Sequence, residues 1–420
     1  MTDTATRPLF PPVTQYTLLA LVAAALYFSP PVYRQDRPHP RGQFMQLAAA
    51  FLRGELTIPL RTDIPVRKGE LIPTGDPSRA FCPYPPLPAV LLMPFVLILG
   101  PDITIAAATR YVSVINVLLF HACIGRLHSR LGFVPFSARQ HWTITAFFAF
   151  GTTAWPVADT GADWHLAHAV ALGAQLLAFL EYAGKGRPGL IGALVGLAAL
   201  SRPTTIIIGM FFLLQSARRR DWGSISLLCI GPAIAVFLLG AYNAARFGSP
   251  FDFAYDRMQL RGEGAENMRQ FGQFSIAYLP RNFFWFFLAP PVPLASGRFP
   301  WMGYDLRGMS LFLASPAFLY AMIALRRIRT STVVRDAAVT LALSLIPLLL
   351  YFNTGYAQFG HRFSMDYMPL LLILMVAGVQ PRLSRVATGF VLLSIVFHAA
   401  AVFVRPIASL PLNIPPLAWH

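Results

Sequence analysis

Residues 224–244 read SISLLCIGPAIAVFLLGAYNA, a run of 21 residues without a charged side chain. As an α-helix this run is about 32 Å long, which matches the roughly 30 Å hydrocarbon core of a bilayer. Similar apolar runs lie near residues 16–33, 87–100, 103–125, 141–158, 166–183, 189–215, 280–295, 308–325, 334–352, 367–380 and 386–404. The pattern predicts an all-α, polytopic membrane protein with about 11 to 13 transmembrane helices in a single transmembrane domain over residues 1–420. Ser201-Arg202-Pro203 interrupts the run 189–215, which is therefore either one kinked helix or two short ones.

The composition agrees with a membrane protein. Only 12% of the 420 residues are charged and 55% are hydrophobic, whereas soluble domains carry about 25% charged residues. The net charge of +16 is explained by Lys and Arg in loops that face anionic lipid head groups, so we expect the bilayer, and no nucleic acid, as the partner. The three cysteines, Cys82, Cys123 and Cys229, lack the spacing of metal ligands and do not form a disulfide framework by pattern.

Short basic clusters beside the ends of apolar runs indicate the orientation. They are Arg218–Arg220, Arg326–Arg329, and Arg382 with Arg385. The positive-inside rule places them in the cytoplasm, so residues 353–366 are predicted to be external. The loop 125–140 is also basic, which favours the cytoplasm. If the runs 87–100 and 103–125 both cross, however, this loop falls on the same side as residues 34–86, so one of the two signals misleads.

Two segments are too polar to cross the bilayer and too long to be turns. Residues 34–86 form the first large external loop and hold eight basic and five acidic residues. Within it, Gln43 to Leu56 repeats apolar residues at helical spacing, which predicts an amphipathic helix lying in the membrane interface. Residues 246–280 form the second large loop and are rich in Phe, Tyr, Arg and Gly. We expect both segments on the same face, covering one cavity.

The first loop supplies the candidate catalytic residues, Asp36 and Asp63. A carboxylate near the membrane surface can act as general base on an acceptor hydroxyl. It can also bind a divalent cation together with a phosphate, so such a cation stays open as a cofactor, although no cofactor is specifically indicated. The competing interpretation is a solvated loop carboxylate paired with a neighbouring Arg.

Arginines and their neighbours supply the candidate binding residues. Arg202 lies inside an apolar run and needs an acid or an anionic ligand as partner. Arg246 and Arg362 lie where spans meet loops, and several arginines at one membrane face favour an anionic ligand that carries phosphate. Head-group contact is the simpler alternative. The full set of candidate substrate-binding residues is Tyr84, His168, Arg202, Asn243, Arg246, His361, Arg362 and Asp366.

An ordered set of motifs resembles a known class of enzyme. Phe51-Leu52-Arg53-Gly54 ends the predicted interfacial helix and Pro85-Pro86-Leu87-Pro88 opens the next apolar run. Residues 242–251 read YNAARFGSPF and residues 358–366 read QFGHRFSMD. This order resembles the GT-C class of membrane glycosyltransferases, and more narrowly bacterial members similar to protein O-mannosyltransferases and aminoarabinose transferases.

The resemblance implies an inverting glycosyltransferase of the cell envelope, multi-pass in the bacterial inner or plasma membrane. Such enzymes move a sugar from a polyprenyl-phosphate donor to a lipid, glycan or protein acceptor at the external face, using an acid in the first loop. Many relatives have an acid thirteen positions before the glycine that follows the interfacial helix, where this chain has Arg41 before Gly54. The catalytic acid is therefore either Asp36 or Asp63.

Two other functions remain open from the sequence. Arg202 and the interrupted run 189–215 also fit a transporter or flippase of a lipid-linked or anionic solute, in which broken helices hold the substrate near the midplane. Arg41 in place of an acid fits a non-catalytic scaffold of the GT-C type. A large external loop with an acid favours the enzyme, and fold resemblance alone does not choose among the three.

Overall fold

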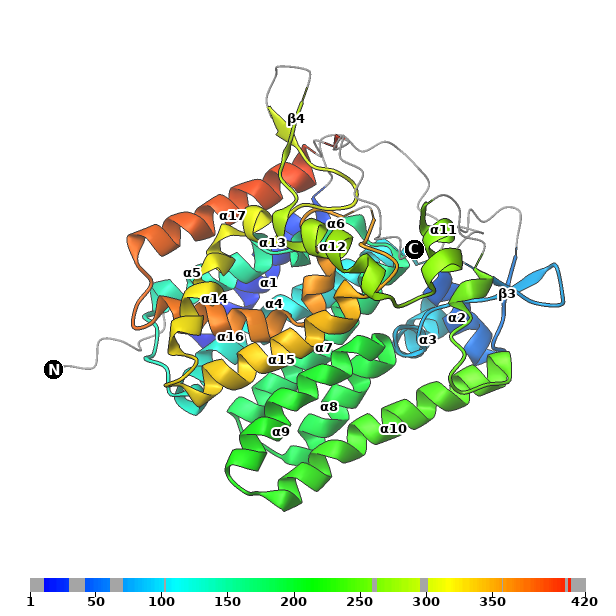
Figure 1. The fold of residues 1–420 in the computed structure, drawn as a ribbon, viewed down its shortest axis with the longest axis horizontal. Helices are drawn as coiled ribbons and strands as arrows, with labels where there is room; N and C mark the ends of the chain where they lie inside the picture. The colour runs from blue at the N-terminus through cyan, green and yellow to red at the C-terminus, as the bar shows by residue number, and fades with distance from the viewer. Residues whose placement is uncertain are drawn as a thin grey trace.

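The computed structural model describes residues 11–29, 42–60, 71–101, 103–258, 263–294, 301–356, 358–404 and 407–408. Its α-helices are α1 (Pro12–Phe28), α2 (Gln43–Leu52), α3 (Leu87–Leu99), α4 (Ile105–Leu131), α5 (Ala138–Phe150), α6 (Ala154–Thr160), α7 (Asp163–Ala183), α8 (Pro188–Ser201), α9 (Gly209–Arg218), α10 (Trp222–Phe247), α11 (Glu263–Phe271), α12 (Leu279–Phe283), α13 (Leu311–Ala314), α14 (Leu319–Ala324), α15 (Thr332–Leu349), α16 (Met368–Val379) and α17 (Arg385–Phe403). The predicted all-α architecture is confirmed (Figure 1).

Short helical turns and two small sheets complete the chain. The turns are η2 (Pro203–Ile208), η3 (Tyr255–Arg257), η4 (Ile276–Tyr278), η5 (Phe284–Leu288), η6 (Pro316–Phe318), η7 (Leu325–Arg327) and η8 (Arg362–Asp366). The strands β1 (Ile58–Pro59), β3 (Arg79–Phe81) and β2 (Ile72–Pro73) form an antiparallel sheet in the order β1-β3-β2, and β4 (Val292–Pro293) pairs with β5 (Met302–Gly303).

Within the described residues, five helices are long and apolar enough to cross a membrane: α4, α7, α10, α15 and α17. Five shorter apolar helices accompany them, α1, α2, α3, α8 and α16. The chain is thus an integral membrane protein. The run 189–215 is divided as its sequence predicts, into α8, η2 and α9. Arg202 takes an extended conformation between α8 and η2, because the ring of Pro203 clashes with a helical conformation of the residue before it.

Helices α8 and α10 pack closely because glycines remove side chains from their contact. A Cβ on Gly231 of α10 would lie 2.2 Å from the carbonyl oxygen of Gly192, and a Cβ on Gly196 would lie 2.5 Å from the carbonyl oxygen of Gly231. Gly192 and Gly196 are four apart and share one face of α8, which is the small-residue spacing typical of membrane helix pairs. Most of α10 otherwise stays exposed, along the outer edge of the molecule beside α8 (Figure 1).

Helix α3 resolves the conflict over orientation. Its 13 residues cover about 20 Å, less than the roughly 30 Å of a bilayer core. The ring of Tyr84, just before α3, lies 5.4 Å from that of Phe44, and a Cβ on Gly42 would lie 2.6 Å from the Cβ of Ile105, just after α3. The chain before α3 and the first residue of α4 therefore both lie near the start of α2, so the chain returns to the same side after α3. Of the two conflicting signals, the apolar run 87–100 is the one that misleads, because the helix it forms does not cross the membrane.

The helix predicted in the first loop is present as α2, but it is more enclosed than a helix lying in an interface. Seven of its ten residues are buried, including the polar Gln43 and Gln46. Helix α3 and strand β1 pack against it. Together α2, α3 and β3 gather at one end of the molecule (Figure 1), and the structure places them beside the end of α10 through the Phe81 and Phe247 rings, 5.3 Å apart.

Candidate functional site

A cavity of about 300 Å³ lies where the two large loops meet the ends of α8, α10 and α15. Arg202, Arg246 and Arg362 all line it, so we call it the arginine cavity. The described part of the first loop contributes Pro83, Tyr84 and Pro85 to its wall, and the described part of the second contributes Phe253, Tyr255, Met258, Gln273 and Phe274. The described parts of the two loops thus meet over one cavity.

Arg246 is held by neutral groups. It is the last basic residue of α10, just before the left-handed Gly248 that ends the helix. Its Nη1 donates to the Cys82 carbonyl at 2.7 Å and its Nη2 donates to the Asn243 side-chain oxygen at 2.8 Å. The guanidinium also lies 3.7 Å from the centre of the Tyr242 ring. None of these partners carries a formal charge, so Arg246 is oriented without being neutralised.

Arg202 differs, because it has a carboxylate partner. Its Nε and Nη2 donate to the two oxygens of Asp366 at 2.6 and 2.9 Å, and the Thr204 hydroxyl donates to the same carboxylate at 2.8 Å. His168 Nδ1 lies 2.9 Å from Asp366 Oδ1. Burial raises the pKa of the Asp366 carboxyl, but Arg202 and His168 outweigh burial and hold this pKa below its usual value. The acid that Arg202 requires is therefore Asp366.

Arg362 begins the turn η8 and points into the arginine cavity beside aromatic rings. Its Nη1 donates to the Tyr356 carbonyl at 2.6 Å, and its guanidinium lies 5.0 Å from the Phe363 ring centre and 5.8 Å from that of Trp164. The spacing of Arg362 and Asp366 allows an i,i+4 ion pair. In the structure the Asp366 carboxylate is instead bound by Arg202, Thr204 and His168.

Two predicted binding residues lie behind the cavity wall. His168, on α7, is fully buried against Asp366. His361 is buried and stacks on Phe286 with 3.5 Å between ring centres, and neither of its ring nitrogens has a hydrogen-bond partner among the described residues. Neither histidine lines the cavity. The neighbouring side chains of His361 and Arg362 thus point in different directions, the histidine into the apolar core and the arginine into the cavity.

A strained turn places Tyr255 in the cavity wall. Ala254 has φ of 53°, a left-handed conformation that residues with a Cβ rarely adopt. Asp252 stabilises it, because its Oδ1 accepts a hydrogen bond from the Ala254 N–H at 2.7 Å while the same carboxylate pairs with Arg257. Tyr255 and Tyr351 interact side by side and both line the cavity.

The two candidate catalytic residues, Asp36 and Asp63, lie outside the described residues. Among the residues that do line the arginine cavity in the structure, none is Asp or Glu. The described residues also hold no group of three His, Cys, Asp or Glu side chains close enough to bind a metal ion. The described part of the site therefore does not fit a divalent cation, and it offers arginine charge rather than carboxylate chemistry.

Sequence reasoning missed several residues of this site. Trp164, Tyr242, Tyr255 and Tyr351 line the cavity. Tyr255 belongs to the aromatic-rich segment 246–280 and Tyr242 opens the motif at 242–251, whereas Trp164 and Tyr351 carry no sequence signal for the site. Thr204 shares Asp366 with Arg202, and its only signal was its place directly after the Arg202-Pro203 break.

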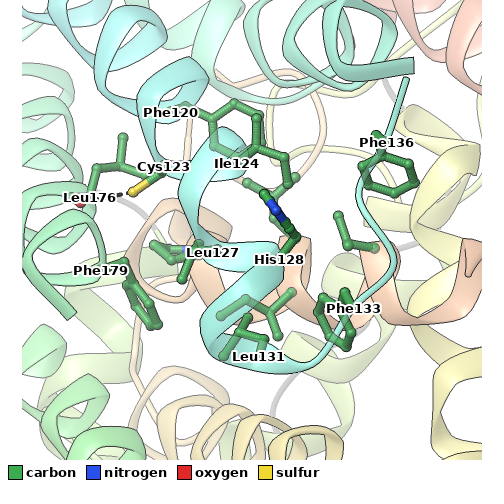
Figure 2. Close-up of a pocket in the computed structure, with 14 residues that line it drawn as sticks. Phe120, Cys123, Ile124, Leu127, His128, Leu131, Phe133, Phe136, Leu176 and Phe179 are labelled. Carbon is green, nitrogen blue, oxygen red and sulfur yellow. Dashed lines mark hydrogen bonds between the residues drawn. The ribbon is translucent and has the colours of Figure 1, made fainter. Parts of the chain in front are cut away.

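A second, much smaller cavity of about 30 Å³ lies between α4, α7, α16 and the linker that follows α4. Figure 2 shows its apolar side chains, with His128 among them and the Cys123 thiol donating to the Leu176 carbonyl at 3.2 Å. Its volume is close to that of a single water molecule and its lining is almost wholly apolar, so it is a packing void rather than a substrate site.

Comparisons with known proteins find no matching protein-family model and no matching curated sequence. Among solved structures, two membrane glycosyltransferases of the GT-C class are similar to this chain. One is ArnT from Cupriavidus metallidurans bound to undecaprenyl phosphate, with a TM-score of 0.47 and 14% identity over 93% of this chain. The other is the apo oligosaccharyltransferase of Archaeoglobus fulgidus, with a TM-score of 0.48 and 14% identity over 94% of this chain. This chain spans 63% of the first protein and 55% of the second.

Proposed function

We propose that the protein is a membrane glycosyltransferase that moves a sugar from a polyprenyl-phosphate donor to an acceptor at the external membrane face. One observation carries the proposal: Arg202, Arg246 and Arg362 line one cavity whose described lining has no carboxylate. Asp366 neutralises Arg202, whereas the described hydrogen-bond partners of Arg246 are neutral oxygens, so Arg246 keeps its positive charge and Arg362 adds a second guanidinium to the lining. The resemblance of the motifs to GT-C enzymes suggests a polyprenyl-phosphate sugar as the donor and a lipid, glycan or protein as the acceptor.

Arginine suits the donor phosphate for geometric and electrostatic reasons. A guanidinium can donate two parallel hydrogen bonds to phosphate oxygens, which fixes the orientation of the group as well as its charge. Near the membrane surface water is scarce, so this attraction is stronger than in bulk solution. Arg246 is well suited to the role, because its neutral partners orient the guanidinium and leave its charge in place.

The proposed reaction is a displacement at the anomeric carbon of the donor sugar. The acceptor hydroxyl oxygen attacks the anomeric carbon of the donor sugar, and the bond from that carbon to the phosphate oxygen breaks with inversion. The bonding electrons leave with the polyprenyl phosphate, whose negative charge Arg246 and Arg362 stabilise. The acceptor proton passes to a carboxylate base, for which Asp36 and Asp63 are the candidates.

Donor binding tests the arginine part of the proposal. Arg362→Lys keeps the charge but loses the two-pronged contact. We expect undecaprenyl phosphate to bind this variant about tenfold more weakly, which corresponds to the loss of about one hydrogen bond to a charged group. Arg307→Lys is the matched control, since Arg307 pairs with Asp305 and does not line the cavity. Equal affinities of the Arg362→Lys variant and the native protein in nanodiscs would refute a phosphate role for Arg362.

Sugar transfer tests the enzymatic part. Asn in place of both Asp36 and Asp63 removes every first-loop candidate for the base. We expect transfer from a polyprenyl-phosphate sugar to fall by about a hundredfold or more, with undecaprenyl phosphate binding nearly unchanged, because a base acts in the transition state. The single variants then identify which acid acts. Transfer at the native rate by the double variant excludes this mechanism. Movement of the lipid across vesicle membranes without formation of a glycosylated product favours the transporter instead.

A further inference from the structure

A second polar depression lies at the far end of the helices from the arginine cavity. Its volume is about 390 Å³, and Arg326 and Arg327 line it together with Phe133, Val134 and Ile323, so we call it the basic groove. Helix α4 begins at Ile105, beside the first loop, and its 27 residues carry the chain about 40 Å before Gly132 reaches the groove. The basic groove and the arginine cavity therefore lie on opposite sides of the membrane.

The walls of the groove are fixed by close contacts between the helix ends. Gly378 near the end of α16 has no room for a side chain, since a Cβ there would lie 1.9 Å from the Tyr320 carbonyl oxygen of α14. On the other wall, the Val134 N–H donates to the Gln380 side-chain oxygen at 2.8 Å, and Gln380 Nε2 donates back to the Val134 carbonyl at 3.3 Å. These contacts define the groove as part of the fold rather than as a gap between loose chains.

The groove carries excess positive charge. Arg326 and Arg327 are exposed, and no described carboxylate pairs with either. Arg327 donates one hydrogen bond, at 3.3 Å, to the Ala377 carbonyl of α16. The ends of α4 and α16 each contribute about half a negative charge to the groove. These partial charges are smaller than the two full charges of Arg326 and Arg327, so the groove keeps a net positive charge for a ligand.

The groove also lies at the depth of lipid head groups. Met322, Ile323 and Leu325 of α14 and η7 are exposed apolar side chains, which a membrane protein turns toward lipid tails. Arg326 follows them directly in sequence, so the polar part of the groove begins where the apolar surface ends. Ile323 and Val134 extend this apolar surface into the groove wall. A ligand with a phosphate next to an acyl chain matches this order of surfaces.

We propose that the basic groove binds one anionic membrane phospholipid, with its phosphate on Arg326 and Arg327 and its acyl chain along Ile323 and Val134. Charge complementarity selects the head group, and the adjoining apolar surface selects a lipid over a free phosphate. The site is independent of the proposed glycosyl transfer and lies on the other side of the membrane from it.

The test measures lipid binding to the full chain in detergent, by the rise in melting temperature as phosphatidylglycerol is added. We expect the half-saturating phosphatidylglycerol concentration to rise about tenfold in the double variant Arg326→Gln/Arg327→Gln, which loses charged hydrogen bonds to the phosphate. The double variant Arg219→Gln/Arg220→Gln removes the same charge from another exposed basic turn and should bind as the native protein does. In parallel, Val134→Glu keeps both arginines and places a carboxylate in the groove, so it should weaken phosphatidylglycerol binding even if the arginine variant folds poorly.

Three outcomes overturn the proposal. Equal weakening in the two arginine double variants means that diffuse surface charge, not the groove, attracts the lipid. Equal stabilisation by phosphatidylcholine means that the acyl chains alone bind. Equal stabilisation by glycerophosphate, which has no acyl chain, means that the groove takes a free phosphate instead.

Discussion

The pair between Arg202 and Asp366 offers the most direct test of how the arginine cavity is built. The carboxylate has 2% of its side chain exposed and the guanidinium 19%. Removing one partner of a buried pair leaves the other charge uncompensated, which costs about 3–5 kcal/mol, whereas replacing both partners with apolar residues is often nearly neutral. We therefore expect Asp366→Leu and Arg202→Met each to destabilise the protein, and the double variant to be more stable than the sum of the two changes predicts.

The size of the loss in stability can be worked out from the contacts of Asp366. Asp366→Leu also deprives His168 and Thr204 of their hydrogen-bond partner, so it should be the more damaging of the two single changes. With an unfolding entropy of about 2.1 cal/mol/K per residue, a loss of about 3–5 kcal/mol in this chain lowers the melting temperature by about 3–6 °C. Melting in nanodiscs, followed by tryptophan fluorescence, measures all four proteins of the cycle.

Two results decide whether Arg202 and Asp366 are energetically coupled. Arg187→Gln is the control, because it breaks an ion pair with a mostly exposed arginine, and such pairs contribute little to stability. Its melting temperature should equal that of the native protein within error. If the two single changes at Arg202 and Asp366 add to within about 0.5 kcal/mol, the side chains are energetically independent, and the pair does not hold η8 against the break in the 189–215 segment.

Three further predictions concern stability. Gly231→Leu should lower the melting temperature markedly, since overpacking costs about 1–3 kcal/mol and the Cβ has no space beside Gly192. Gly223→Leu on the same helix is the control and should leave the melting temperature unchanged, because a Cβ there meets only ordinary contacts. Asn282→Ala should cost about 1–3 kcal/mol, measured by the same melting assay, because its Nδ2 donates at 2.9 and 2.7 Å to the Leu349 and Tyr351 carbonyls at the end of α15. The melting temperatures of the native protein and the Asp366→Leu variant should differ by the same amount from pH 5 to pH 8. The pKa of Asp366 is depressed in the folded protein. Its contribution to stability is therefore complete above its unfolded pKa of about 3.9 and is lost only as the pH falls below that value.

The sequence predicts the helices well because their signal is local. Most candidate apolar runs coincide with one or more helices, but the run 280–295 contains only the short helix α12 and the turn η5 before strand β4. The break in the run 189–215 is readable from Arg202-Pro203 itself. The run 87–100 shows the limit of this signal. Its hydropathy is high enough for a crossing, but its length is not, and only the positions of Phe44 and Ile105 around it establish that the chain returns to the same side.

The candidate site was only partly predictable because its contacts are not local. Chemistry requires a partner for a buried Arg202, but the identity of that partner, 164 residues further along the chain, depends on tertiary packing. His361 and Arg362 are equally prominent in the sequence, yet the turn η8 directs one into the aromatic core and the other into the cavity. The aromatic wall of Tyr255 and Tyr351 joins two distant segments, so neither segment reveals it alone.

The partners of these arginines separate structural roles from binding roles. Arg218 pairs with Asp336 and so joins α9 to α15, and Arg202 pairs with Asp366. In both cases the carboxylate cancels the charge. Arg246 has carbonyl and amide oxygens as partners, which fix the direction of the guanidinium without cancelling its charge. An anionic ligand gains most from an arginine of this second kind, because no existing ion pair has to be broken when it binds. The part of the cavity around Arg246, rather than around Arg202, is therefore where the structure best supports a donor phosphate.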